Sequence, residues 1–501
     1  MDASADVLIV GSGSAGCVLA ARLSKNPGVR VTVLEAGGPA TDPDITVPQK
    51  WPLLAGRDYD WCYRTTPQAG TAGRTHDWPR GRVIGGSSCL NAMAHVRGAK
   101  GDFRLWHEVT GSTRWSYEGL LPGFRKMESS SGGPLAVMVP DAELSPVVRA
   151  YMAAGLAAGI PWRGDHNSGN LLGVAPNALT IRAGQRVSAA DAYLDPVRGR
   201  SNLSVLSHAK VQTLVVSGNK VTGVAAEIDG KYTSFSAGMT LLCAGAIGSP
   251  LLLMRSGIGP APSLARAGVR CIADRAGIGD NLHDHLLTAG NVYRAKRSVP
   301  PSLLQHSESL TYLDAGDLTL MDGVPDIVVG CVAGPTVTEC FERPPAGSAY
   351  TLLSGVTHPT SRGRLTLSGP GVDDPPLIDP AYLSTELDRR LARRALEAAR
   401  TIGHQPALEE WRAEEIYPGI DCRSDADLDA FLERAVMTHH HPVGTCAMGS
   451  VVDADLKLHG FEGLYVVDAS VIPSITSGPI HAAVLAIAET FAAEVAGPKL
   501  V

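Results

Sequence analysis

The first 35 residues alternate between apolar runs and a glycine-rich turn. The apolar runs Val7–Val10 and Val29–Leu34 each predict a buried strand. Three glycines with the spacing Gly-x-Gly-x-x-Gly follow the first run: Gly11, Gly13 and Gly16. Small residues over Cys17–Leu23 then predict a helix. A strand, glycine turn, helix and strand of this length are typical of a dinucleotide-binding unit, so we expect an α/β fold that begins as a Rossmann-like domain.

Each position of the glycine turn has a task in holding a pyrophosphate. Gly11 permits the tight turn, Gly13 lets a pyrophosphate approach the backbone, and Gly16 lets the helix pack against the strand. The helix start, with Ser14 and Ala15, offers unpaired N–H groups and the positive end of the helix dipole. The other interpretation of the pattern is a glycine-rich turn without a ligand.

The acidic residue at the end of the second strand bears on which nucleotide binds. Glu35, followed by Ala36, can accept hydrogen bonds from a ribose diol. Its charge repels a 2′-phosphate, which disfavours NADP. The motif alone does not separate NAD from FAD.

The rest of the chain predicts a domain interrupted by an insertion. Strand-like segments return at 203–228, with a turn at 217–219, and at 239–243 and 464–467, and a helix is expected over 481–495. The sequence between residues 289 and 430 has a different pattern, which includes a charged helix at 386–400. We expect residues 1–288 and 431–501 to form a discontinuous Rossmann-like domain, with excursions around 140–190. Residues 289–430 are expected to form an inserted α+β substrate-binding domain with an antiparallel sheet.

Composition excludes several classes of function. The net charge of −6 argues against a nucleic-acid-binding protein, because such proteins neutralise phosphates. The most apolar late stretch contains Glu489 and Glu494 and is too short to span a bilayer. The nine cysteines form no CxxC motif and fit reduced thiols, so a cytoplasmic protein without an integral membrane segment is expected. The oligomeric state stays open.

Five further segments occur in a fixed order. They are Gly81–Asn91, Gly245–Gly259, Gly277–His285, Ser361–Gly363 and His441–Gly449. In this order they resemble the glucose–methanol–choline (GMC) oxidoreductases, and the resemblance extends over about residues 5 to 495. It implies an enzyme that oxidises an alcohol to an aldehyde or ketone by hydride transfer to N5 of FAD, with O2 or another electron acceptor as the oxidant.

The resemblance also implies which residues contact the cofactor. Gly85 and Gly86 lack side chains, so the backbone can lie against a flat flavin ring. Ser87 and Asn91 can donate hydrogen bonds, and Asn91 is expected near flavin N5. Val211 corresponds to the residue that meets the adenine. The remaining expected contacts are Arg82, Ala92, Ala244, Gly245, Asp468, Ala469 and His481.

The reaction needs a base for the hydroxyl proton, and His441 occupies the position of the family's catalytic histidine. Histidine suits this task because its ordinary pKa lies near working pH. The run His439–His441 has a polar loop or a metal site as its other interpretations. Three consecutive ligands rarely converge on one ion, so no metal is expected. His283 and His285 are expected to form a structural turn.

The sequence departs from the family pattern opposite His441. The position that usually carries His or Asn falls on Pro479, which has no side-chain donor. A small slip of the loop would make His481 the partner, and His439 is a third candidate. A His-x-His segment with proline in the partner position is similar to the pyridoxine 4-oxidase branch of the family. This likeness implies a small aromatic alcohol, such as pyridoxine, as substrate.

Other functions remain open on the same scaffold. A hydroxynitrile lyase keeps FAD without using its redox chemistry, and a choline or aliphatic alcohol dehydrogenase uses a different substrate. An NAD(H) enzyme would use only the Rossmann start and would be colourless when purified.

We predict that FAD is bound without a covalent link. Family members with covalent flavin carry a histidine immediately before the asparagine, and here that position is Leu90. Precipitation of the purified protein with acid should therefore release the yellow cofactor into the supernatant. Yellow colour that stays with the precipitate would contradict the prediction.

Overall fold

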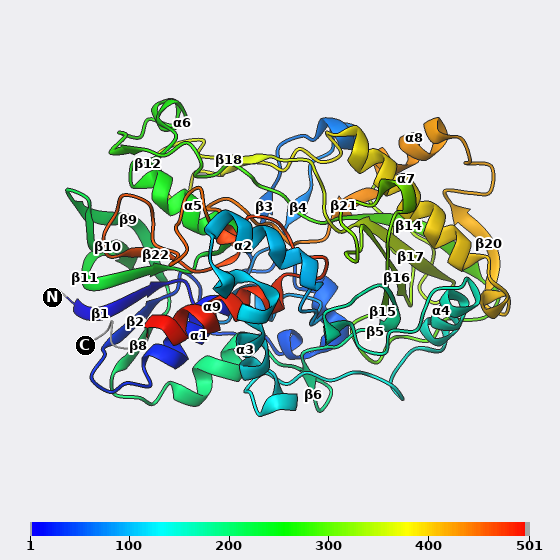
Figure 1. Cartoon of the computed structure of the whole chain (residues 1–501), viewed down its shortest axis with the longest axis horizontal. Helices are drawn as coiled ribbons and strands as arrows, with labels where there is room; N and C mark the ends of the chain where they lie inside the picture. The colour runs from blue at the N-terminus through cyan, green and yellow to red at the C-terminus, as the bar shows by residue number, and fades with distance from the viewer. Residues whose placement is uncertain (1–2, 496–501) are drawn as a thin grey trace.

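The computed structural model describes residues 3–495, and the predicted start of the chain folds as a βαβ unit (Figure 1). Strand β1 spans Ala3–Val10, helix α1 Ser14–Leu23 and strand β2 Val31–Leu34. The helix thus begins three residues before the predicted Cys17, directly after Gly13. Residues 1–2 and 496–501 of the expected first domain lie outside the described residues.

The first sheet has the strand order β8-β2-β1-β11-β10-β9, with β22 paired to β11. The further strands are β8 (Leu203–Leu206), β9 (Ala209–Ser217), β10 (Lys220–Ile228), β11 (Lys231–Leu242) and β22 (Leu464–Val466). Strands β1, β2, β8, β11 and β22 run parallel, whereas β9 and β10 form an antiparallel extension. The parallel strands therefore end at one edge of the sheet, where ligands of such sheets bind.

Helices cover this sheet and explain its continuous apolar runs. Helix α9 (His481–Val495) packs on α1 and on α3 (Tyr117–Met127), and the three lie together in Figure 1. Parallel strands buried on both faces read as unbroken apolar segments, and Val7, Leu8 and Ile9 are fully buried.

The late apolar stretch is a core helix. Glu489 of α9 is buried and forms ion pairs with Arg22 of α1 and Lys126 of α3, so its charge is compensated inside the protein. Within residues 3–495, no helix is both long and apolar enough to cross a membrane.

The second sheet is antiparallel, with the order β20-β14-β17-β16-β15-β5 and with β21 paired to β14. Its strands are β5 (Gly173–Pro176), β14 (Leu286–Ala295), β15 (Ser307–Leu313), β16 (Ile327–Val332), β17 (Ala349–Val356), β20 (Arg412–Tyr417) and β21 (Val436–Thr438). Helices α4 (Pro146–Ala157) and α7 (Glu386–Gly403) pack on it. The antiparallel sheet and the Rossmann-like sheet together confirm the predicted fold class.

The elements packed around the first sheet are called the first body, and those around the second sheet the second body. One segment between the strands of the second sheet returns to the first body. Strands β18 (Arg364–Thr366) and β19 (Leu377–Asp379) form a separate hairpin that contacts α5 (Gly245–Arg255). Gly363 pairs with Leu282, and Ile378 pairs with Thr65. The chain therefore crosses between the two bodies within the expected insert 289–430.

The remaining elements are short. The helices are α2 (Arg104–Thr110), α6 (Ala261–Arg266) and α8 (Asp425–Ala435). The strands are β3 (Tyr63–Arg64), β4 (Asp77–Trp78), β6 (Ile181–Arg182), β7 (Gln185–Arg186), β12 (Ile258–Gly259) and β13 (Ala273–Asp274).

Candidate active site

A cavity of about 1870 Å³ extends from the carboxyl ends of β1, β2 and β11 to the second sheet. Gly11 follows β1, Glu35 follows β2, Ala244 and Gly245 follow β11, and Asp468 follows β22. Parallel strands thus gather these residues from distant parts of the sequence. Of the residues that the sequence assigns to the site, all but Gly16 and Gly85 line the cavity.

The three glycines of the first loop, which follows β1, differ in what an added Cβ atom would meet. A Cβ atom at Gly11 would lie 2.6 Å from the Cys243 carbonyl oxygen, and one at Gly16 would overlap the Gly11 carbonyl. At Gly13 the nearest atom would be 3.9 Å away. Gly13 therefore leaves open space in the cavity, whereas Gly11 and Gly16 serve the packing of strand and helix.

The glycines of the second loop, Gly85 and Gly86, are required by contacts within the protein, whereas their expected place against the flavin stays a prediction. Gly85 has φ +99°, and a Cβ there would lie 2.6 Å from Cys89 Sγ, outside the cavity lining. A Cβ at Gly86 would lie 2.6 Å from the Cα of Gly13. Both glycines are therefore required by the packing of the loops, and only Gly86 borders the cavity.

Glu35 lines the cavity and supports the glycine turn. Its carboxylate accepts hydrogen bonds from the backbone N–H and hydroxyl of Ser12, at 2.8 and 2.9 Å, and from the Gly37 N–H at 2.9 Å. Burial raises the pKa of Glu35 despite these donors. Each carboxylate oxygen has two lone pairs, so acceptor capacity remains for a ribose hydroxyl.

Asp468 is saturated by the protein itself. One oxygen accepts from the N–H and hydroxyl of Ser470, and the other from the Gly245 N–H at 2.8 Å and the Ser249 hydroxyl at 2.6 Å. Burial raises the pKa of Asp468. The side chain therefore joins the end of β22 to the start of α5, and the backbone at Ala469 and Gly245 is what faces the cavity.

Asn91 is oriented by an arginine that sequence reasoning missed. Its Oδ1 accepts from Arg186 Nη1 at 2.7 Å and from the Met93 N–H at 3.0 Å, which leaves the amide NH2 as the group for a ligand. The same arginine donates to the carbonyls of Ser88, Asn91 and Ile45. A single arginine outside any motif gives no signal of this role in the sequence.

The three consecutive histidines follow β21 and change direction at the middle residue. His440 has φ +65°, and its N–H donates to the Thr438 hydroxyl while its carbonyl accepts from Arg80. As a result the rings of His439 and His441 lie on the same side, with centroids 4.4 Å apart, and both line the cavity.

A buried aspartate holds this segment in place. Asp284 accepts hydrogen bonds from the His441 N–H at 2.6 Å, the Thr438 hydroxyl at 2.6 Å and the Tyr382 hydroxyl at 2.5 Å. Burial raises its pKa. The pairing of β14 with β21 brings Asp284 and His285 beside the histidine run.

His283 and His285 have different surroundings, although the sequence predicts one structural turn for both. His283 Nδ1 lies 2.6 Å from the Asn281 carbonyl and its Nε2 accepts from the Ile475 N–H, so it supports the turn. His285 Nδ1 lies 2.9 Å from His441 Nδ1, and its Nε2 lies 2.8 Å from the Thr357 carbonyl. His285 thus contacts the candidate base.

The rings of His285, His439 and His441 place one nitrogen each within 4.8 Å of one another. This spacing alone would allow a metal ion, but two of the nitrogens already form a hydrogen bond with each other. The absence of a bound metal stays a prediction.

Pro479 and His481 lie at the start of α9, on the cavity wall. Pro479 also borders a small void next to His285 and His439. Both ring nitrogens of His481 are buried and have no hydrogen-bond partner among the described residues. Burial lowers the pKa of His481 to about 3. Such unpartnered nitrogens fit a polar ligand in the cavity.

Comparison with known proteins identifies the family. The sequence pattern described as GMC oxidoreductase matches residues 5–287 in its N-terminal part and residues 359–488 in its C-terminal part. This chain belongs to the GMC oxidoreductase family. As a member of the family, the protein is a flavoenzyme that uses FAD to oxidise a small-molecule alcohol.

Individual GMC relatives cover almost the whole chain. A pyridoxine 4-oxidase of Microbacterium luteolum is 51% identical, over 97% of this chain and 98% of its own length. The crystal structure of pyridoxine 4-oxidase from Mesorbium loti has a TM-score of 0.95 at 52% identity, covering 98% of this chain and 99% of that one. An oxygen-dependent choline dehydrogenase of Pseudomonas fluorescens is 35% identical, over 98% of this chain and 94% of its own length.

The residues of this GMC protein fit FAD. Gly13 leaves space beside the start of α1, where no side chain caps the helix, so the first N–H groups can bind phosphate. The backbone at Gly245, at the start of α5, also borders the cavity. The NH2 group of Asn91 supplies one polar group, and the ring of His481, whose nitrogens have no hydrogen-bond partner among the described residues, supplies another.

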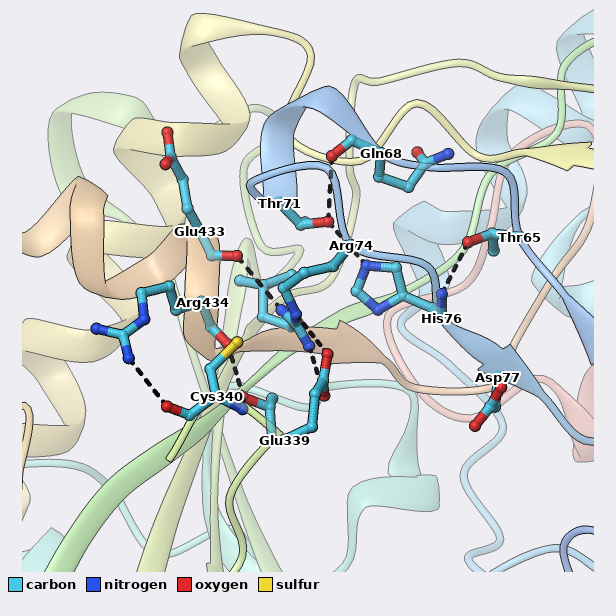
Figure 2. A network of polar contacts seen from close by, with 12 residues as sticks. Thr65, Gln68, Thr71, Arg74, His76, Asp77, Glu339, Cys340, Glu433 and Arg434 are labelled. Atoms are coloured by element: carbon cyan, nitrogen blue, oxygen red, sulfur yellow. Dashed lines mark hydrogen bonds and ion pairs between the residues drawn. The ribbon is translucent and has the colours of Figure 1, made fainter. Parts of the chain in front are cut away.

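A polar network ties the cavity wall to the strand that precedes the histidines, as Figure 2 shows. Arg74 pairs with Glu339 at 2.8 Å and donates to the carbonyls of Glu433 and Val436, the first residue of β21. The ring of His76 forms a 2.8 Å hydrogen bond with the Thr71 hydroxyl within the same loop. The loop of the first body is thereby joined to the second sheet next to the histidine run.

The open space at Gly13 generates a prediction for cofactor loading. In Gly13→Val the added Cβ would lie 3.9 Å from the nearest protein atom, so the chain should fold, but the valine occupies the space where the pyrophosphate approaches. We expect a folded protein with less than about a tenth of the wild-type FAD per chain. Absorbance of the purified protein and circular dichroism measure the two properties.

Gly199→Val is the matched control for this variant. Gly199 has an ordinary φ, a Cβ atom added to it would have no neighbour within 4 Å, and the residue has no place in the cavity lining. The control should retain full FAD. Full loading of Gly13→Val would contradict the predicted pyrophosphate contact.

Proposed function

We propose that this GMC oxidoreductase oxidises pyridoxine, or a closely similar aromatic alcohol, at a primary alcohol group to the aldehyde, with O2 as electron acceptor. The observation that carries the proposal is the pair His439 and His441, which line the cavity together with Pro479. The relatives named pyridoxine 4-oxidase support the choice of substrate.

His441 is the proposed general base. Burial, with the neighbouring His439 and His285, lowers the pKa of His441 well below its ordinary value, so the ring is neutral near pH 7. A neutral imidazole with one free nitrogen can take the hydroxyl proton of the alcohol. Bound FAD supplies the acceptor for the hydride from the alcohol carbon. The positive charge then on His441 stabilises the developing alkoxide.

His439 is proposed to make the polar contact that Pro479 cannot make. Its ring lies 4.4 Å from that of His441, close enough for both to meet one substrate oxygen. Burial lowers the pKa of His439 to about 3, so it acts as a neutral hydrogen-bonding group. His481, whose two ring nitrogens find no partner within residues 3–495, is proposed to contact the flavin.

The choice between pyridoxine and choline rests on the relatives, because the carboxylates of the cavity wall do not decide it. Every carboxylate among the described lining residues already has a partner in the chain: Glu35 with Ser12 and Gly37, Asp77 with Arg64, Glu339 with Arg74, Asp373 with Lys210, Asp374 with Gly371, and Asp468 with Ser249 and Ser470. Asp77, Glu339 and Asp373 have a cationic partner that compensates their charge. The partners of Glu35, Asp374 and Asp468 are neutral hydrogen-bond donors. Choline is the second candidate, because the choline dehydrogenase is 35% identical, against 51% for the pyridoxine 4-oxidase.

We further propose which parts of the chain bind FAD and the substrate, and in which compartment the protein works. Residues 1–288 and 431–501 would hold FAD, and residues 289–430 would contribute the substrate side. All nine cysteines are unpaired, which fits a reducing cytoplasm.

A survey of alcohols under anaerobic conditions tests the proposed function. Pyridoxine, benzyl alcohol, choline and an aliphatic alcohol are each mixed with the oxidised protein, and bleaching of the flavin absorbance is followed. We expect pyridoxine to bleach the flavin fastest, and admission of O2 to restore the colour. Faster bleaching by choline would overturn the substrate, and cleavage of a cyanohydrin without bleaching would indicate a hydroxynitrile lyase.

Loss of the proposed base should slow flavin reduction. His441→Ala is expected to lower the limiting rate by about 10²- to 10⁴-fold, the usual effect of removing a general base. His459→Ala, at an exposed histidine outside the cavity lining, is the control and should keep the wild-type rate.

Because acid must protonate His441 to inactivate it, the wild-type rate should stay level from about pH 8 to 6 and fall only below. A midpoint near the ordinary histidine pKa would contradict the assignment.

A further inference from the structure

Two hydrogen-bonded histidines connect a backbone carbonyl to the cavity. His285 Nε2 lies 2.8 Å from the Thr357 carbonyl oxygen, and His285 Nδ1 lies 2.9 Å from His441 Nδ1. His285 is buried, whereas His441 borders the cavity. The two rings stand nearly perpendicular, at 87°, with centroids 5.1 Å apart. Residue 285 lies in the segment of the chain expected to form only a structural turn.

The carbonyl determines the direction of this chain of hydrogen bonds. A carbonyl oxygen only accepts, so His285 Nε2 must carry a proton and donate it to Thr357. In a neutral imidazole the other nitrogen is then an acceptor, so His285 Nδ1 accepts. The partner must donate, which places the proton of His441 on Nδ1. The remaining nitrogen of His441, Nε2, keeps its lone pair.

The surroundings of His285 keep the ring neutral. A protonated His285 would donate from Nδ1 as well, so His441 would have to accept with its own Nδ1 and carry its proton on Nε2, which would then have no lone pair for the substrate. The ring is buried and packed near His439 and His358, while the carbonyls of Thr357 and Thr476 face it as acceptors. The carboxylate of Asp102 lies 3.3 Å from Nε2 of His358. Burial and the two neighbouring histidines lower the pKa of His285 to about 3.

We infer that His285 is a positioning residue that holds His441 in the Nδ1–H tautomer and thereby keeps the lone pair of His441 Nε2 directed toward the substrate hydroxyl. The inference rests on the proposed function of His441 as base. The arrangement follows the same principle as a carboxylate that orients a catalytic histidine through Nδ1. Here the orienting group is neutral. It selects the tautomer without raising the basicity of His441 by an adjacent negative charge.

Two substitutions at one position separate this role from a purely structural one. His285→Asn keeps an acceptor, because its Oδ1 is as many bonds from Cα as Nδ1 of histidine. His285→Leu removes the acceptor at similar volume. Both variants lose the bond to the Thr357 carbonyl, so any difference between them reports on the contact with His441.

We expect His285→Leu to lower the limiting rate of anaerobic flavin reduction by about 10²-fold or more, with a small change in the substrate dissociation constant. His285→Asn should stay within about tenfold of the wild type. FAD content and melting temperature are measured for both. Equal rates in the two FAD-loaded variants would overturn the inference.

His283→Asn is the control for loss of a buried histidine in the same turn. The hydrogen bonds of the His283 ring go to backbone groups of residues 281 and 475 rather than to His441. This variant should melt at a lower temperature and keep the rate of flavin reduction per bound FAD. A fall in rate as large as that of His285→Leu would show that any disturbance of the turn has the same effect, and would overturn the inference.

The tautomer can also be measured directly in the wild-type holoenzyme. A long-range ¹H–¹⁵N spectrum of protein that carries ¹⁵N-labelled histidine distinguishes Nδ1–H from Nε2–H. The signals of residue 441 are identified as those that are lost in His441→Asn. An Nδ1–H pattern supports the inference even if His285→Leu does not fold, and an Nε2–H pattern overturns it. Absence of flavin reduction in the wild type with every alcohol would instead refute the proposed function, while leaving this measurement unaffected.

Discussion

Two loops are in contact at Gly13 and Gly86, where neither has a side chain, and the site depends on this contact. A Cβ atom on Gly86 would lie 2.6 Å from the Cα of Gly13, so no other residue fits there without movement. The contact brings the first loop, after β1, against the loop that carries Asn91. Because the other face of Gly13 stays open, one pair of glycines both closes the protein core and leaves room for a pyrophosphate.

Buried carboxylates give the rest of the site its shape. Asp468 and Asp284 each accept several hydrogen bonds from backbone N–H groups and hydroxyls. A buried carboxylate without such donors would be costly, so each one fixes the segments that supply them. Asp468 sets the start of α5, and Asp284 sets the backbone of His441. Both carboxylates therefore act as structural connectors.

Local patterns predicted the elements and the family, but contacts between distant segments needed the structure. The apolar run Val7–Val10 and the glycine spacing are local signals, because a buried parallel strand and a tight turn each restrict neighbouring residues. His283 and His285 share one motif, and only the pairing of β14 with β21 directs one ring to His441 and the other to the backbone. Arg186 orients Asn91 from 95 residues away, and no spacing in the sequence announces that contact.

The link made by Arg74 has a mechanical consequence. This side chain joins the loop of the first body to the carbonyl of Val436, from which the chain runs through β21 into the histidines. Because Val436 begins β21, a shift of the loop that carries Arg74 would act on the strand that leads into the histidines. The orientation of the proposed base therefore depends in part on an arginine that lies outside the second sheet, 362 positions before Val436 in the sequence.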